Sequence, residues 1–195
     1  MKNSKIAESA LIIQDEVIAL IRESLRDKGN SSVVPISQEA LATLRLALPC
    51  PIPDELQQWL LRCNGTYAGQ GGIYGHCPND KFIDILAHYE LYPEWKKAGW
   101  IPIASDGCGN YYLIDQFDES VSNNPILFVE PFSTQGFAGY AVGSGLWIFL
   151  KMMLTRELLQ VYGTWPFSKE YMLQNDPDIR NYSHRYPLPW ELPNV

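Results

Sequence analysis

The sequence predicts a fold of the α+β class, in which helices and strands occupy separate parts of the chain. Three helical periodicities come first, at residues 4–28, 37–48 and 53–63. A hairpin and two further strand candidates follow between residues 101 and 142, and a last long helix begins after them. An order of helices, then strands, then a helix is typical of this class.

The helical segments are recognised by apolar residues that recur every three or four positions. In residues 4–28 this stripe includes Ile13, Val17 and Ile21, and a helix of that length would span nearly 40 Å at about 1.5 Å per residue. Ser37 is placed to cap the second helix. Trp59 lies in the stripe of the third helix, which we expect to face the core.

The segment from Trp100 to Asp115 predicts a β-hairpin around which the rest of the chain is organised. Alternating apolar residues flank a polar stretch that contains Gly107 and Gly109. Glycine tolerates a positive φ, so the chain can reverse direction between the two runs. We therefore expect a tight turn with an antiparallel strand on each side.

The remaining elements complete one predicted domain over residues 1–162, with a long helix at 1–30 and the core at 37–162. Strands are expected at 125–131 and 137–142, and Ser144 is placed to cap the last long helix. Residues 163–195 contain five prolines and several aromatic residues. Proline excludes a long helix or a central strand there, and the aromatics favour a tail packed on the domain.

Composition and charge exclude some classes of partner. The net charge is −7, from 15 basic and 22 acidic residues, which disfavours a nucleic-acid ligand and favours a basic protein partner. The first residues carry charges and show no secretory signal, and no apolar run is long enough to span a membrane. The four cysteines form no Cys-x-x-Cys pair, so we expect reduced thiols and a cytoplasmic protein.

Three ordered motifs carry a resemblance to a known family. The first is a helix that ends at Asn64-Gly65, the second is the Trp100–Asp115 hairpin, and the third is the helix start from Ser144 to Leu150. Together they resemble the Smi–Knr branch of the SUKH superfamily over residues 37–160. The resemblance implies a largely antiparallel sheet of about four to six strands, with helices on the N-terminal side and a closing helix.

The same resemblance implies a function without catalysis. Bacterial relatives are immunity proteins that bind and neutralise a toxin, often a nuclease, and the short single-domain form of this chain favours that role. Fungal relatives are regulatory hubs of cell-wall signalling, so a regulatory scaffold is the alternative. No cofactor is implied, and the oligomeric state is left open.

The acidic residues supply an observation that is independent of the family. Between Ala98 and Leu150 the sequence has no Lys or Arg, and the carboxylates there are candidates for binding a basic toxin domain. The five candidates are Asp106, Asp115, Asp118, Glu119 and Glu130. For Asp106 a role within the turn is the favoured interpretation, because Asp often bonds to its own backbone there.

The cysteines, histidines and glycines fit structural roles better than catalytic, metal or phosphate sites. Cys108 with a histidine from elsewhere would make a thiol hydrolase, a third and remote alternative. Cys63, His76, Cys77 and Cys108 lack the close-paired spacing of zinc ligands, so no metal site is predicted. The glycines between residues 69 and 75 fit no phosphate-binding fingerprint.

Overall fold

The structure is a computed structural model that describes residues 2–26, 33–116, 124–131, 139–159 and 168–192, with side chains from Leu11 onward. Within these residues the helices before the sheet are α1 (Lys2–Arg26), α2 (Gln38–Ala47), α3 (Asp54–Arg62), α4 (Ile85–Leu91) and α5 (Pro93–Ala98). The strands are β1 (Trp100–Ser105), β2 (Tyr111–Asp115), β3 (Ile126–Val129) and β4 (Gly139–Gly143). After them come α6 (Leu146–Leu158), α7 (Lys169–Asn175) and two 3₁₀ turns, η1 (Pro177–Tyr182) and η2 (Pro189–Glu191). The predicted α+β class is confirmed.

The sheet is a meander in which each strand pairs antiparallel with the next, in the order β1-β2-β3-β4. The predicted hairpin is confirmed, with Ser105 opposite Tyr111 where the strands meet the turn. Gly107 and Gly109 have φ values of +76° and +98°, so the turn uses the backbone freedom that the sequence indicated. Four described strands lie within the expected range of about four to six.

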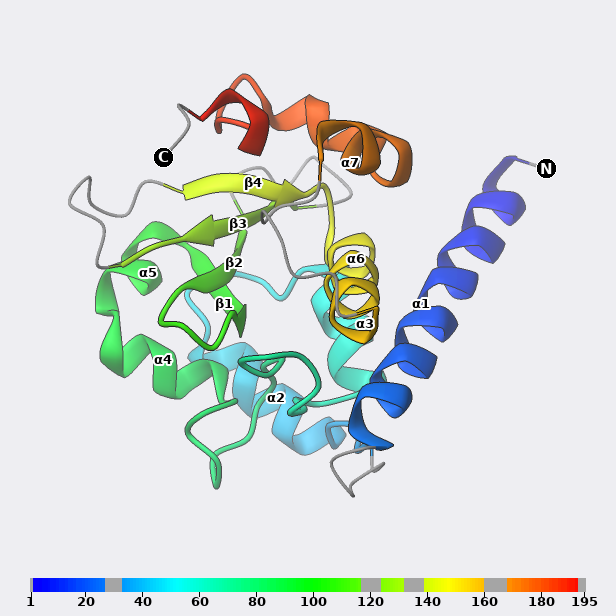
Figure 1. The fold of residues 1–195 in the computed structure, drawn as a ribbon. Helices are drawn as coiled ribbons and strands as arrows, with labels where there is room; N and C mark the ends of the chain where they lie inside the picture. Colours follow the sequence, from blue (N-terminus) through cyan, green and yellow to red (C-terminus); the bar gives the residue numbers. More distant parts are fainter. Residues whose placement is uncertain (1, 27–32, 117–123, 132–138, 160–167, 193–195) are drawn as a thin grey trace.

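Helices cover both faces of the sheet (Figure 1). Side chains alternate between faces along a strand, so Tyr111 and Tyr112 of β2 point in opposite directions. The ring of Tyr112 lies 4.8 Å from that of Phe149 in α6, whereas Tyr111 lies 5.0 Å from Trp95 in α5. Strand β2 of the hairpin is therefore packed between two helical layers.

The long first helix is confirmed and packs along α6 (Figure 1). Val17, Ile21 and Leu25 of its apolar stripe are buried in the core. Lys151 of α6 also makes an ion pair of 2.6 Å with Glu16. The contact stabilises a helix that would be marginal alone, since helices in proteins depend mostly on packing of the apolar face.

Both outer strands of the sheet are covered by other segments. The backbone N–H of Tyr74 donates to the carbonyl of Ile103 in β1 at 2.7 Å. On the other edge, Ala141 of β4 donates to the carbonyl of Pro187 at 3.1 Å, and the C-terminal residues lie across this edge (Figure 1). Covered edges leave fewer unpaired backbone groups for pairing with another chain.

The start of α6 differs from the sequence prediction. Ser37 does cap α2, but Ser144 does not cap α6, which begins at Leu146 with Gly145 before it. The Leu146 N–H donates instead to Glu55 Oε2 at 2.7 Å, while the N–H and hydroxyl of Ser144 donate to Asp176 at 2.7 and 2.5 Å. The Glu55 carboxylate from α3 therefore replaces the expected local cap, while Asp176 from the tail holds Ser144 just before the helix.

Burial governs the electrostatics of these carboxylates. It raises the pKa of both Glu55 and Asp176, and the hydrogen bonds that the two side chains accept partly oppose the rise.

The helices in the described part of the chain lack the combination of length and apolar character needed to cross a membrane.

Candidate functional site

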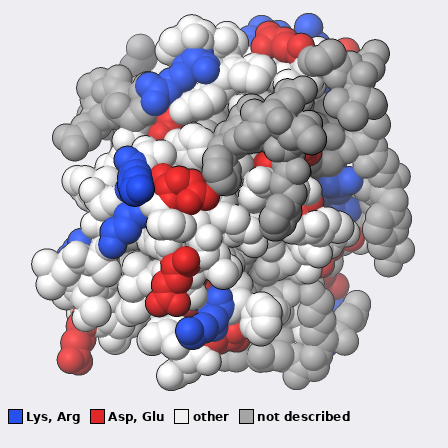
Figure 2. Space-filling view, turned by 90° about the vertical axis from the view of Figure 1, so that its left-hand side faces the viewer, with Lys and Arg blue, Asp and Glu red and all other residues white. Residues whose placement is uncertain are grey.

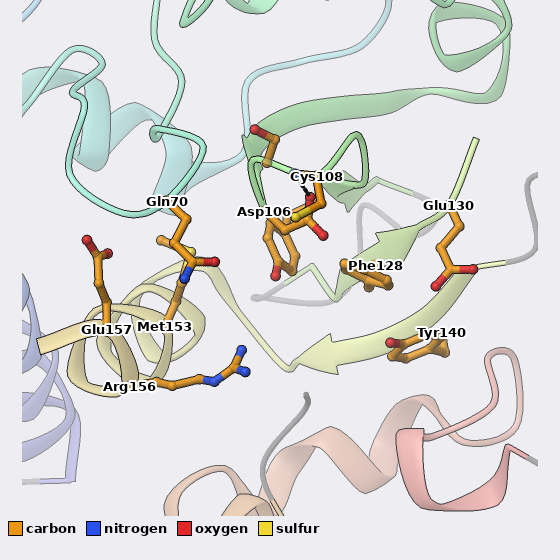
Figure 3. A pocket seen from close by; sticks show the side chains of 11 residues that line it. Gln70, Asp106, Cys108, Phe128, Glu130, Tyr140, Met153, Arg156 and Glu157 are labelled. Atoms are coloured by element: carbon orange, nitrogen blue, oxygen red, sulfur yellow. Dashed lines mark hydrogen bonds between the residues drawn. The ribbon is translucent and has the colours of Figure 1, made fainter. Parts of the chain in front are cut away.

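A cavity of about 330 Å³ lies between the sheet, the hairpin turn and α6 (Figure 3). The hairpin contributes one wall, the three later strands the floor, and the second half of α6 the opposite wall. Exposed residues at its rim, among them Cys108 and Glu130, open the cavity to the surface. Its described lining residues are Gln70, Ser105, Asp106, Cys108, Tyr112, Phe128, Glu130, Tyr140, Met153, Arg156 and Glu157.

The floor is a row of three aromatic rings, one from each of three neighbouring strands. Tyr112 is directly opposite Phe128 in the β2–β3 pairing, and Phe128 is opposite Tyr140 in the β3–β4 pairing. Both neighbouring pairs have ring centroids 5.3 Å apart, in tilted orientations. Tyr112 and Phe128 are buried, whereas Tyr140 is only half-buried, so its ring is the accessible end of the row.

Charged groups on the cavity walls are mainly acidic. The described lining contains the carboxylates of Asp106, Glu130 and Glu157 and the guanidinium of Arg156. Burial raises the pKa of Tyr140, and the Glu130 and Asp106 carboxylates raise it further. These two carboxylates therefore act on the same phenol, although they lie far apart in the sequence.

Asp106 performs the turn role that its sequence context predicts. Its Oδ1 accepts from the backbone N–H of Cys108 at 2.7 Å and of Asn110 at 3.1 Å, and its Oδ2 accepts from Asn110 Nδ2 at 2.8 Å. The hairpin turn is thus closed around one carboxylate that also lines the cavity. The turn fixes the position of this negative charge.

Asp115 occupies a different environment from the other candidates. It is 1% exposed, and it belongs to the strand face opposite to Tyr112. Its carboxylate accepts from the Tyr186 hydroxyl and lies 3.4 Å from Arg185 Nη2. Burial raises the pKa of Asp115, and these two partners from the tail oppose the rise.

The structure therefore brings together two of the five candidate residues. Asp106 and Glu130 both line the cavity, and Asp115 is buried inside the molecule. Asp118 and Glu119 lie outside the described residues. By contrast, Figure 2 shows basic and acidic side chains interspersed on the face that carries α4 and α5, so that face presents no single sign of charge.

The cysteines and histidines mostly occupy structural positions. Burial raises the pKa of the Cys50 and Cys77 thiols to about 11 and of Cys63 to about 12. His76 Nδ1 lies 3.3 Å from Asp84, and His88 stacks on Tyr74 with ring centroids 4.2 Å apart. Cys108 lines the cavity, and the described residues that line it with Cys108 include no histidine. The described residues also contain no group of three or more His, Cys, Asp or Glu arranged to hold a metal ion.

Sequence reasoning did not single out the aromatic floor or the α6 wall. The signal for the floor is one aromatic residue in each of three successive strands, and it becomes readable only when the strand register is known. The signal for the wall is the spacing of Met153, Arg156 and Glu157, which places them on one side of a helix. Gln70, from the glycine-rich loop, carried no signal of its own.

Comparison with protein families finds a match to the SMI1 / KNR4 family (SUKH-1) over residues 35–151, more than half of the chain. The chain belongs to this family. A search of curated proteins found no match. The SUKH-1 match starts just before α2 and ends within α6, so it includes the hairpin and the aromatic floor. Met153, Arg156 and Glu157 follow the matched span, as does the tail, while α1 precedes it.

Proposed function

We propose that this SUKH-1 domain is a non-catalytic binding protein that neutralises a toxin by binding to it. The observation that carries the proposal is the family match over residues 35–151. The resemblance to the bacterial immunity proteins of this family implies toxin binding, and this chain offers an acidic cavity with an aromatic floor. Aromatic residues are enriched where proteins bind one another, which supports the cavity as part of the binding surface.

The charge distribution supports a basic toxin domain as the partner. The chain carries a net charge of −7, and the segment between Ala98 and Leu150 contains no basic residue. Two carboxylates of that segment, Asp106 and Glu130, line the cavity. A complementary field of this kind speeds association by about 10- to 1,000-fold at low salt and loses its effect as salt rises.

The test begins with the genes that neighbour this one and uses a toxin domain encoded there. The purified full chain is titrated with that domain by calorimetry at low and high salt. The chain is also expressed together with the toxin domain, and rescue of cell growth is scored. We expect binding, rescue, and an affinity at least about tenfold lower for Glu130→Lys at low salt. Glu39→Lys, an exposed position on α2 outside the cavity lining, is the matched control.

The possible outcomes separate the parts of the proposal. A neighbouring toxin domain that neither binds nor is neutralised contradicts the immunity function. Binding that is unaffected by Glu130→Lys, or equally affected by Glu39→Lys, removes the cavity from the interface while leaving the function in place.

A regulatory scaffold is the second candidate, and exposed apolar residues on α1 favour it. Leu11 and Ile12 are 58% and 55% exposed, on a helix that precedes the family match. Two adjacent exposed apolar side chains on a helix outside the matched span are suited to contact a second partner. This candidate expects several cellular partners that bind in the absence of any toxin gene and are lost in the double variant Leu11→Ser and Ile12→Ser.

A further inference from the structure

The accessible end of the aromatic row is the starting point for a more specific site. Tyr140 is half-buried, and Phe128 supports its ring from the neighbouring strand at 5.3 Å between centroids. Tyr112 continues the row beneath the hairpin and is itself held by Phe149 at 4.8 Å. A ring fixed in this way presents a rigid face, and its negative π-cloud attracts a cation placed over it.

Negative charge is concentrated beside that ring. Glu130 and Asp106 line the same cavity as Tyr140, and Glu130 lies next to its ring (Figure 3); both carboxylates also raise the pKa of Tyr140. Asp106 is already held by Cys108 and Asn110 within the turn, whereas Glu130 is exposed at the rim. Glu130 is therefore the carboxylate that can turn toward a ligand.

The two ends of the cavity differ in charge. Arg156 and Glu157 come from the α6 side, and Glu130 comes from the far side, beyond Phe128 and next to Tyr140 (Figure 3). The α6 end therefore carries one basic and one acidic side chain, whereas Glu130 supplies a negative charge at the Tyr140 end. With a volume of about 330 Å³, the cavity is at the lower end of the size that ligand pockets show, which fits one long side chain.

We propose that the Tyr140 end of the cavity binds an arginine side chain of the partner protein. The guanidinium stacks on the Tyr140 ring and pairs with the Glu130 carboxylate, while the aliphatic part of the side chain lies along the floor. Arginine fits better than lysine because its planar group can stack on a ring and pair with a carboxylate at the same time. The identity of the partner rests on the proposed function, whereas recognition of the guanidinium can be tested without it.

The test uses small probes and the full chain. N-acetyl-L-arginine methylamide is titrated into the protein, and amide chemical shifts are followed by NMR. N-acetyl-L-citrulline methylamide is the matched neutral probe, since it has nearly the same shape without the charge. We expect saturable millimolar binding of the arginine probe, with shifts centred on the amides of Cys108, Glu130 and Tyr140, and at least about tenfold weaker binding of the citrulline probe.

Two variants and a control complete the experiment. Glu130→Gln should weaken binding of the arginine probe by about fivefold or more, because the carboxylate that pairs with the guanidinium is lost. Residue 130 is exposed, so this substitution does not endanger folding. Tyr140→Leu should weaken binding of the probe by a similar factor through loss of the ring. Glu39→Gln, on α2, should leave the affinity unchanged.

Three results would overturn the inference. One is the absence of saturable shifts up to about 100 mM probe, and another is equal binding of the citrulline probe. The third is a shift pattern that lies away from the cavity or is insensitive to Glu130→Gln. None of these depends on a toxin, so failure here is distinguishable from failure of the immunity function.

Discussion

Replacing Glu55 by alanine tests whether a tertiary contact starts α6. The carboxylate of Glu55 accepts from the backbone N–H groups of Leu146 and Trp147, the first two residues of the helix. Hydrogen bonds to a charged group contribute about 1.5–3 kcal/mol, and loss of a helix cap costs about 0.5–2 kcal/mol. We expect Glu55→Ala to lower the free energy of unfolding by about 2–3 kcal/mol. For a chain of this size that corresponds to a fall in Tm of about 4–12 °C.

The assay is urea and thermal unfolding followed by circular dichroism, with two comparison variants. Glu55→Gln retains one acceptor oxygen and should lose about half as much stability as the alanine variant. Glu90→Ala removes an exposed carboxylate, 3.8 Å from Lys81, and should change stability by less than about 0.5 kcal/mol. If Glu55→Ala were as mild as Glu90→Ala, the helix start would not depend on Glu55 and the reasoning would be refuted.

Three further predictions concern the core of the domain. In Gly71→Ala the new Cβ would lie 2.0 Å from Ser105 Oγ. We expect this clash to lower the free energy of unfolding, measured by thermal unfolding, by about 2–3 kcal/mol. Gly99→Ala, with φ +74° and open space, should cost about 1 kcal/mol, and the reverse order would contradict the packing argument. Burial lowers the pKa of His88 below its ordinary 6.5, so the unfolded state binds the proton first and stability is lost as pH falls below that value. In urea unfolding, His88→Phe should lose less free energy of unfolding than the unchanged protein between about pH 7 and 5.5. An identical dependence on pH in the two proteins would exclude His88 as the cause. Asp115→Asn should reduce stability by about 1 kcal/mol in the same assay yet leave arginine-probe binding unchanged, and weakened binding would contradict its placement away from the cavity.

Local patterns in the sequence were sufficient for most of the fold. Apolar periodicity indicated α1, and turn-forming glycines between alternating runs indicated the β1–β2 hairpin; the structure confirms both. These features depend on residues within a few positions of one another. The cap of α6 could not be predicted in this way, because its acceptor, Glu55, is 91 residues away in the sequence.

The candidate site shows the same limit more strongly. The sequence made both Asp106 and Asp115 candidates for binding a partner, although it favoured a role within the turn for Asp106. The pleat and the partners separate them: Asp106 folds back on its own turn, and Asp115 meets Tyr186, 71 residues further along the chain. The aromatic floor depended on the register of three strands, which no single segment specifies.

Net charge alone does not say where the proposed basic partner would bind. Asp176 and Asp115 are 2% and 1% exposed, and Glu55 is engaged at the start of α6, so these acidic residues serve the interior. Their charges are balanced by hydrogen bonds at close range and add little field outside the molecule. In our proposal, recognition of a basic partner depends on a local arrangement: an exposed carboxylate, Glu130, beside the fixed ring of Tyr140. A local arrangement selects for the shape of the cation as well as its sign, which a diffuse acidic surface cannot do.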